Sequence, residues 1–106
     1  MHVLVTGAAG FVGAAICADL SARGVPVLAL DRHPHRQILP GMTPVTADLR
    51  DSVALATALR GRGLTHAIHA AAVTPDAARE TAEPDLILEI NLLGAVRLLQ
   101  AAAACG

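Results

Sequence analysis

Thr6-Gly7-Ala8-Ala9-Gly10-Phe11-Val12-Gly13 is the stretch of sequence that decides the fold. Before it lies the apolar run His2–Thr6, rich in β-branched residues and ending at a glycine, which is typical of a buried parallel strand. After it, apolar residues recur every fourth position up to Gly24, at Val12, Ile16 and Leu20. This spacing predicts a helix with one packed face, so the glycines form a strand-to-helix turn.

The spacing of the glycines indicates what the turn can bind. Gly7, Gly10 and Gly13 allow a tight turn, a close approach of the main chain to a pyrophosphate, and packing of the helix near the strand. The helix N-terminus adds N–H groups without partners and the positive end of the helix dipole. The same spacing elsewhere in a chain would more often be a simple connection. Between a strand and a helix it predicts a dinucleotide site.

An acidic residue closes the next apolar run, Val25–Leu30. Asp31 follows the turn by about 20 residues, the position from which a carboxylate accepts hydrogen bonds from the adenosine ribose hydroxyls and repels a 2′-phosphate. Arg32 and Arg36 could instead attract that phosphate, so NAD is preferred and NADP is the less favoured alternative. The other interpretation of Asp31 is an ordinary turn residue at the end of a strand.

The remaining chain continues the alternation of strands and helices. After a connection over Arg32–Met42, we expect two more strands and two more helices, in the order Thr43–Ala47, Asp51–Arg62, Thr65–Ala70 and a long helix from Glu83-Pro84 through Ala104. The prediction is an α/β fold: an incomplete, doubly wound parallel sheet of the Rossmann type, with about four strands alternating with helices. The length of 106 residues fits one domain.

Composition and charge exclude several classes of function. The net charge is -1 and Phe11 is the one aromatic residue, so we expect no nucleic-acid surface. The apolar stretch from 86 to 104 is interrupted by polar and charged residues, so we expect no membrane span. Cys17 and Cys105 have no metal-ligand or redox spacing, which favours reduced thiols in a cytoplasmic protein.

The histidines do not predict a metal site. His66 and His69 are three residues apart on an expected strand and therefore point to opposite faces. His33 and His35 flank a proline without a third ligand nearby. We therefore assign no residue to a metal.

The chain resembles the N-terminal part of the extended short-chain dehydrogenase/reductase superfamily, the NAD-dependent epimerase/dehydratase family. The similarity covers nearly the whole chain, and the order of its motifs is more specific than any single one. The motifs are Thr6-Gly7-Ala8-Ala9-Gly10-Phe11-Val12-Gly13, Asp31, Ala47-Asp48-Leu49-Arg50-Asp51, His69-Ala70-Ala71-Ala72 and Asn91-Leu92-Leu93-Gly94.

The resemblance implies specific contacts to the cofactor. Main-chain groups at Phe11 and Val12 would meet the pyrophosphate, and Asp48 with Leu49 would hold the adenine edge. For Asp48, the alternative is a residue that only caps a turn.

Toward the other end of the cofactor, the resemblance implies that Ala70 and Ala71 line the exit of the fourth strand, where only small side chains fit. It also implies that Asn91 lies near the nicotinamide ribose. The alternatives are that the two alanines only fill the core and that Asn91 is solvated or caps a helix.

The catalytic residues that the resemblance implies are a Tyr-x-x-x-Lys pair with a serine or threonine. The chain has no tyrosine and no lysine, and Ser21 and Ser52 stand in the wrong part of the expected fold. We therefore assign no catalytic residue. We expect residues 1–106 to be a partial NAD(P)-binding domain, inactive alone and truncated before the substrate-binding C-terminal region.

Three hypotheses about function follow. The first is part of an NAD-dependent oxidoreductase that acts on a hydroxylated substrate such as a sugar nucleotide, a small molecule bound only by a full-length form. The second is a non-catalytic NAD(P)-sensing regulatory module, and the third is a binder of another adenosine compound such as S-adenosylmethionine. A Tyr-x-x-x-Lys sequence encoded downstream would favour the first over the second. The oligomeric state depends on the missing half, so a homo-oligomer is left open.

Overall fold

The computed structural model describes residues 1–35, 37–71, 82–83, 85, 91 and 93–104. Four strands and three helices are defined in this part of the chain. In chain order they are β1 (Val3–Thr6), α1 (Phe11–Ala22), β2 (Val27–Asp31), β3 (Met42–Thr46), α2 (Ser52–Leu59), β4 (His66–His69) and α5 (Gly94–Ala104).

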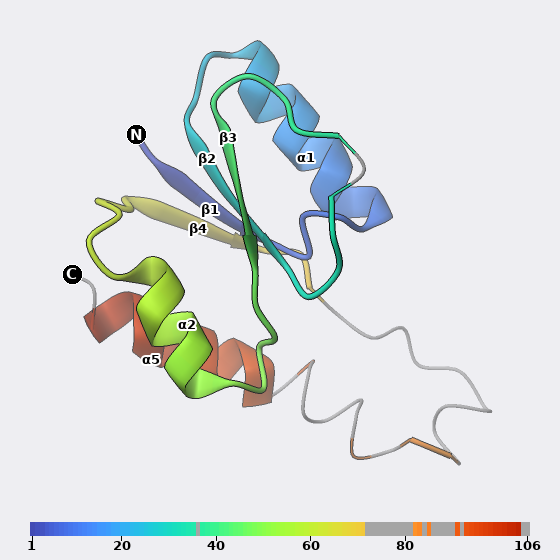
Figure 1. Cartoon of the computed structure of the whole chain (residues 1–106), viewed down its shortest axis with the longest axis vertical. Helices are drawn as coiled ribbons and strands as arrows, with labels where there is room; N and C mark the ends of the chain where they lie inside the picture. The colour runs from blue at the N-terminus through green and yellow to red at the C-terminus, as the bar shows by residue number, and fades with distance from the viewer. Residues whose placement is uncertain (36, 72–81, 84, 86–90, 92, 105–106) are drawn as a thin grey trace.

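The strands form one parallel sheet in the order β3-β2-β1-β4. The chain starts at β1, moves outward through β2 to β3, and then returns to place β4 on the other side of β1. Figure 1 shows α1 over one face of this sheet and α2 with α5 over the other. The doubly wound α/β prediction is confirmed. The direction in which strands are added reverses between β1 and β4, and folds of this kind bind ligands at such a point, beyond the carboxyl ends of the strands.

The two central strands, β1 and β2, are buried on both faces of the sheet, and their successive side chains point to opposite sides. On one side, Leu4, Leu28 and Leu30 pack in a cluster with residues of α2 and α5. On the other side, Val3, Val5, Val27 and Ala29 pack with Cys17 of α1. This two-sided burial is why β1 and β2 are continuous apolar runs with no polar alternation.

The packed face of α1 differs from the sequence prediction. Gly13 and Cys17 are the buried residues of the helix, and Ile16 and Leu20 pack beside them. Val12, which the fourfold spacing placed on the packed face, is 60% exposed. The packed face is rotated because Gly13, which has no side chain, lets the start of α1 approach the turn that follows β1.

The other boundaries agree with the sequence to within a few residues. The Asp51 side chain caps α2 by accepting a hydrogen bond from the Ala54 N–H at 3.0 Å. Pro44 lies in the edge strand β3, where a missing N–H is tolerated. Of the long helix predicted over 83–104, α5 is the C-terminal part, and most of 83–92 lies outside the described residues. No helix among the described residues is long and apolar enough to cross a membrane.

Two adjacent leucines of α5 allow a test of how this helix packs on the sheet. Leu98 is 4% exposed and belongs to the core cluster, whereas Leu99 is 70% exposed. We expect Leu98→Ala to lower the free energy of unfolding by about 2–5 kcal/mol. Leu99→Ala, the matched control, should change it by no more than about 0.5 kcal/mol. Urea denaturation followed by circular dichroism measures both, and equal losses would contradict the packing.

Candidate functional site

The glycine turn is held between β1 and the exit of β4. Gly7 has φ +64°, a left-handed conformation that disfavours other residues, and its carbonyl accepts a hydrogen bond from the Gly10 N–H at 3.0 Å. A Cβ added to Gly7 would lie 2.7 Å from both Cα and N of Ala71. The first glycine is therefore required both by its backbone conformation and by the chain that leaves β4.

The third glycine fixes where α1 begins. A Cβ on Gly13 would lie 2.0 Å from the Gly7 carbonyl oxygen and 2.6 Å from its carbon, so no other residue fits without moving the helix. A Cβ on Gly10 would meet the same oxygen at 3.2 Å, a much milder conflict. The start of α1 is thus seated directly on the turn.

The N-terminus of α1 faces outward from this contact. Gly10 is the N-cap residue and makes no side-chain capping bond, and its carbonyl accepts from the Ala14 N–H at 2.8 Å. The N–H groups of the first helical turn have no partner within a helix. Phe11 is 96% exposed and Val12 is 60% exposed, so this end of α1 lies at the surface. Together with the helix dipole, this is an arrangement that favours an anion.

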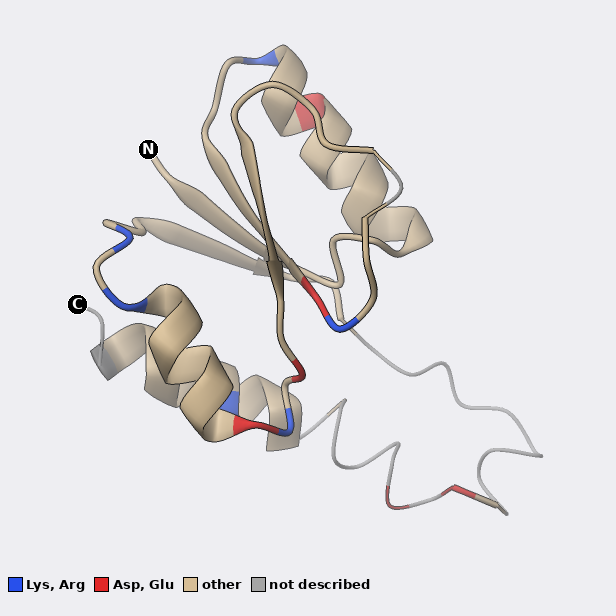
Figure 2. Cartoon of the chain, in the orientation of Figure 1, with Lys and Arg blue, Asp and Glu red and all other residues tan. Residues whose placement is uncertain are grey.

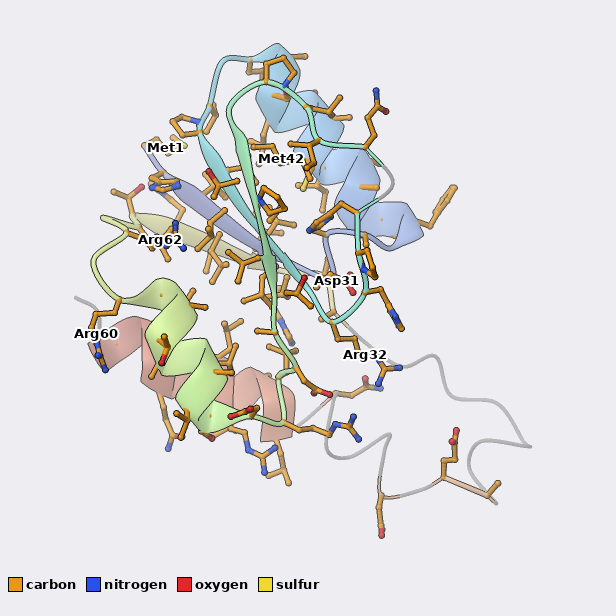
Figure 3. All side chains as sticks on the ribbon, viewed as in Figure 1. Met1, Asp31, Arg32, Met42, Arg60 and Arg62 are labelled. Carbon is orange, nitrogen blue, oxygen red and sulfur yellow. The ribbon has the colours of Figure 1, made fainter. Side chains whose placement is uncertain are left out.

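Asp31 lies beside the turn at the end of β2 and is buried. Its Oδ2 accepts a hydrogen bond from the Ala9 N–H at 2.9 Å, and its Oδ1 accepts one from the His33 N–H at 2.9 Å. The neighbouring Arg32 is exposed, and its Nε donates to His33 Nε2 at 3.2 Å. Figure 3 shows Asp31 and Arg32 together at the carboxyl end of the sheet.

Asp48 and Arg50 form an ion pair beyond the end of β3. Arg50 donates to the Asp48 carboxylate, with an Nη2–Oδ2 distance of 2.7 Å, and this hydrogen bond lowers the pKa of Asp48. Leu49 is 5% exposed and its side chain lies in the core cluster, so that side chain does not face a ligand. Figure 2 shows the acidic and basic residues after β2 and β3 at the same end of the sheet.

Thr6 and His69 join the ends of β1 and β4. The Thr6 side chain is fully buried, its Oγ1 lies 2.7 Å from His69 Nδ1, and it accepts a hydrogen bond from the Ala71 N–H at 3.2 Å. His69 is still exposed as a residue, and partial burial of its imidazole lowers its pKa. The sequence prediction gave Thr6 and His69 no role of their own. A polar residue that ends an otherwise apolar buried strand was the available signal.

The predicted residues are thus brought together to different degrees. The three glycines and Asp31 meet around one turn, and partly buried Ala71 touches Gly7. Ala70 is partly buried along the same exit of β4. Asn91 lies in a helical turn just before α5 and is partly buried, but most of its sequence neighbours lie outside the described residues. Among the described residues, no group of three or more His, Cys, Asp or Glu side chains could hold a metal ion.

Residues 3–106 match the model of the NAD dependent epimerase/dehydratase family. The chain belongs to this family. Within it, the chain is 30% identical over 106 residues to a UDP-glucose 4-epimerase of Rhizobium leguminosarum bv. trifolii, an alignment that covers 98% of this chain and 32% of that protein. This member of the epimerase/dehydratase family therefore spans about a third of the length of that relative.

Solved structures of similar proteins have the same fold. The complex of the Thermus thermophilus UDP-glucose 4-epimerase with NAD superposes with a TM-score of 0.84 at 39% identity, over 95% of this chain and 33% of the epimerase. MoeE5 in complex with UDP-glucose and NAD gives a TM-score of 0.84 at 32% identity, over 100% of this chain and 33% of that protein.

The Gly13 contact gives a direct test of the turn. We expect Gly13→Ala to lower the free energy of unfolding by about 1–3 kcal/mol, because the methyl group overpacks against the Gly7 carbonyl. Gly10→Ala should cost less, since its Cβ would lie at 3.2 Å from the same oxygen. Thermal unfolding of the two variants measures the difference, and a Gly13→Ala chain as stable as the Gly10→Ala chain would show that the helix is not seated on the turn.

His69 should make stability depend on pH. Its pKa is lower in the folded chain, so the unfolded chain takes up a proton more readily. This contribution to stability is complete above the ordinary histidine pKa of about 6.5 and is lost as the pH falls below it. In the wild-type chain, the free energy of unfolding should therefore fall as the pH drops just below that value. We expect this fall to be smaller in the His69→Gln variant. Superimposable pH profiles for the variant and the wild-type chain would contradict the assignment.

Proposed function

We propose that this chain binds NAD as the dinucleotide-binding part of an epimerase/dehydratase-type oxidoreductase. One observation carries the proposal: Gly13 is packed on the Gly7 carbonyl, so the N-terminus of α1 opens at the carboxyl end of the sheet, beside the buried carboxylate of Asp31. That pairing of an anion-binding helix end with a hydrogen-bond acceptor suits a diphosphate next to a ribose.

In this proposal the pyrophosphate lies at the start of α1. The main-chain N–H groups of Phe11 and Val12 donate to its oxygens, and the helix dipole favours its charge. Gly7 and Gly13 allow this arrangement, because a Cβ at either position would meet main-chain atoms and push the turn and the helix apart. The similar MoeE5 and Thermus thermophilus structures are complexes with NAD, which supports this role.

The adenosine half lies over the ends of β2 and β3. Asp31 accepts hydrogen bonds from the ribose hydroxyls, and its negative charge disfavours a 2′-phosphate. Asp48 and the main chain of Leu49 hold the adenine edge. Arg32, exposed next to Asp31, is the residue that would favour NADP instead, so the preference for NAD rests on the carboxylate.

The nicotinamide half lies over the exit of β4. Ala70 and Ala71 have side chains small enough to leave room beside the turn, and Asn91 is assigned to the nicotinamide ribose. Bound NAD would supply the hydride acceptor for a hydroxylated substrate such as a sugar nucleotide, the class named for the MoeE5 complex. The catalytic tyrosine and lysine and the substrate-binding region of the family would lie outside residues 1–106.

Titration with reduced cofactor tests the proposal. We expect NADH to bind with a rise in its fluorescence and to bind more tightly than NADPH. S-adenosylmethionine should not compete with NADH. A chain that binds S-adenosylmethionine as well as NADH would overturn the assignment to nicotinamide dinucleotides.

Replacing Asp31 should change cofactor selectivity. We expect Asp31→Ala to weaken NADH binding by about tenfold or more, the value of a hydrogen bond to a charged group. NADPH should lose less affinity, because removing the carboxylate also removes its repulsion of the 2′-phosphate. Asp19→Ala is the matched control, since Asp19 pairs with Arg23 at the far end of α1. Equal losses for both cofactors would contradict the ribose assignment.

A further inference from the structure

The carboxylate of Asp31 is engaged by the main chain on both of its oxygen atoms. Oδ2 accepts from the Ala9 N–H and Oδ1 from the His33 N–H, each at 2.9 Å. Asp31 is 8% exposed, and a buried carboxylate is stable only when it is hydrogen-bonded. Both bonds are made within the chain itself, so they belong to the fold.

The bond to Ala9 reaches the middle of the glycine turn. The preceding residue, Ala8, donates its N–H to the Leu30 carbonyl at 3.2 Å, so two successive N–H groups tie the turn to the end of β2. One of these ties is made by the main chain alone and the other by a side chain. The position of the turn therefore depends in part on the carboxylate of a residue 22 positions away.

We propose that Asp31 is a positioning residue for the diphosphate-binding turn, in addition to being a ligand of the ribose. This second role rests on the proposed binding of a dinucleotide. The carboxylate holds Ala9 and, through it, keeps the turn at the distance from α1 at which the first-turn N–H groups converge on one anion. Loss of the carboxylate weakens diphosphate binding even where no ribose hydroxyl is present.

The two roles are compatible. A carboxylate has about four lone-pair positions. The hydrogen bonds from Ala9 and His33 use one on each oxygen, which leaves one on each oxygen for a ribose hydroxyl. The bonds to the main chain also fix the orientation of the side chain before the nucleotide arrives.

Two nucleotides separate the roles. ADP carries both the diphosphate and the ribose hydroxyls, whereas 2′,3′-dideoxy-ADP keeps the diphosphate and adenine but lacks the hydroxyls. We expect Asp31→Ala to weaken the binding of 2′,3′-dideoxy-ADP about tenfold, from the loss of a charged hydrogen bond that holds the turn. Removing a negative charge near a diphosphate would by itself strengthen binding, so the expected loss has the opposite sign to the electrostatic effect.

A second variant keeps the test independent of charge and of folding. Asp31→Asn removes the same charge as Asp31→Ala but retains one acceptor oxygen, so it should bind 2′,3′-dideoxy-ADP more tightly than the alanine variant. Hydrogen exchange of the Ala9 amide, measured by NMR, should be faster in Asp31→Ala than in the wild-type chain. Asp19→Ala again serves as the control and should leave both measurements unchanged.

The outcomes are distinct. If Asp31→Ala loses affinity for ADP but binds 2′,3′-dideoxy-ADP as the wild-type chain does, Asp31 only contacts the ribose and the positioning role is wrong. If Asp31→Ala does not fold, the wild-type chain itself decides: an Ala9 amide that exchanges there as fast as an amide with no hydrogen-bond acceptor would overturn the positioning role. If the wild-type chain binds neither NADH nor ADP, the proposed function itself fails.

Discussion

The contact between the start of α1 and the carbonyl of Gly7 is the constraint on which the site depends. A side chain at position 13 would lie 2.0 Å from that oxygen, and a side chain at position 7 would lie 2.7 Å from the main chain of Ala71. The turn is therefore tightly packed on two sides, against the helix that follows β1 and against the segment that leaves β4. The N-terminus of α1 and the exit of β4 are therefore both packed against the same turn, which brings them close together.

Buried polar side chains hold the loops around this turn in place. Thr6 and Asp31 each end a buried strand, and each uses its side chain to accept a main-chain N–H from a connection. Thr6 holds the chain at Ala71, and Asp31 holds it at Ala9. An unsatisfied buried polar group would cost about 1–3 kcal/mol, so these bonds stabilise the site as well as shaping it. The ends of three adjacent strands are linked in this way.

The sequence predicted the parts of this structure that are local in the chain. Continuous apolar runs indicated β1 and β2, and the strand-to-helix glycines and Asp31 were recognisable from their positions alone. The face of α1 was wrong because the spacing of apolar residues counts Val12 as core and gives a glycine no weight in packing, although Gly13 makes the closest contact. The link between Thr6 and His69 was missed because it joins residues 63 positions apart, which no local pattern records.

The distribution of side chains around the strand ends also supports one orientation for the proposed dinucleotide. On the side of β2 and β3, the connections carry charged and hydrogen-bonding groups, namely Asp31, Arg32 and Asp48. On the side of β4, the described part of the exit carries His69, whose imidazole is engaged by Thr6, followed by Ala70 and Ala71. The N-terminus of α1, which follows β1, lies between these two sides. A diphosphate bound there would place one nucleoside on the polar side, where its ribose and base can form hydrogen bonds. The β4 side offers small side chains, which suit a ring that must stay accessible to a reacting partner. This asymmetry supports adenosine over β2 and β3 and nicotinamide over β4.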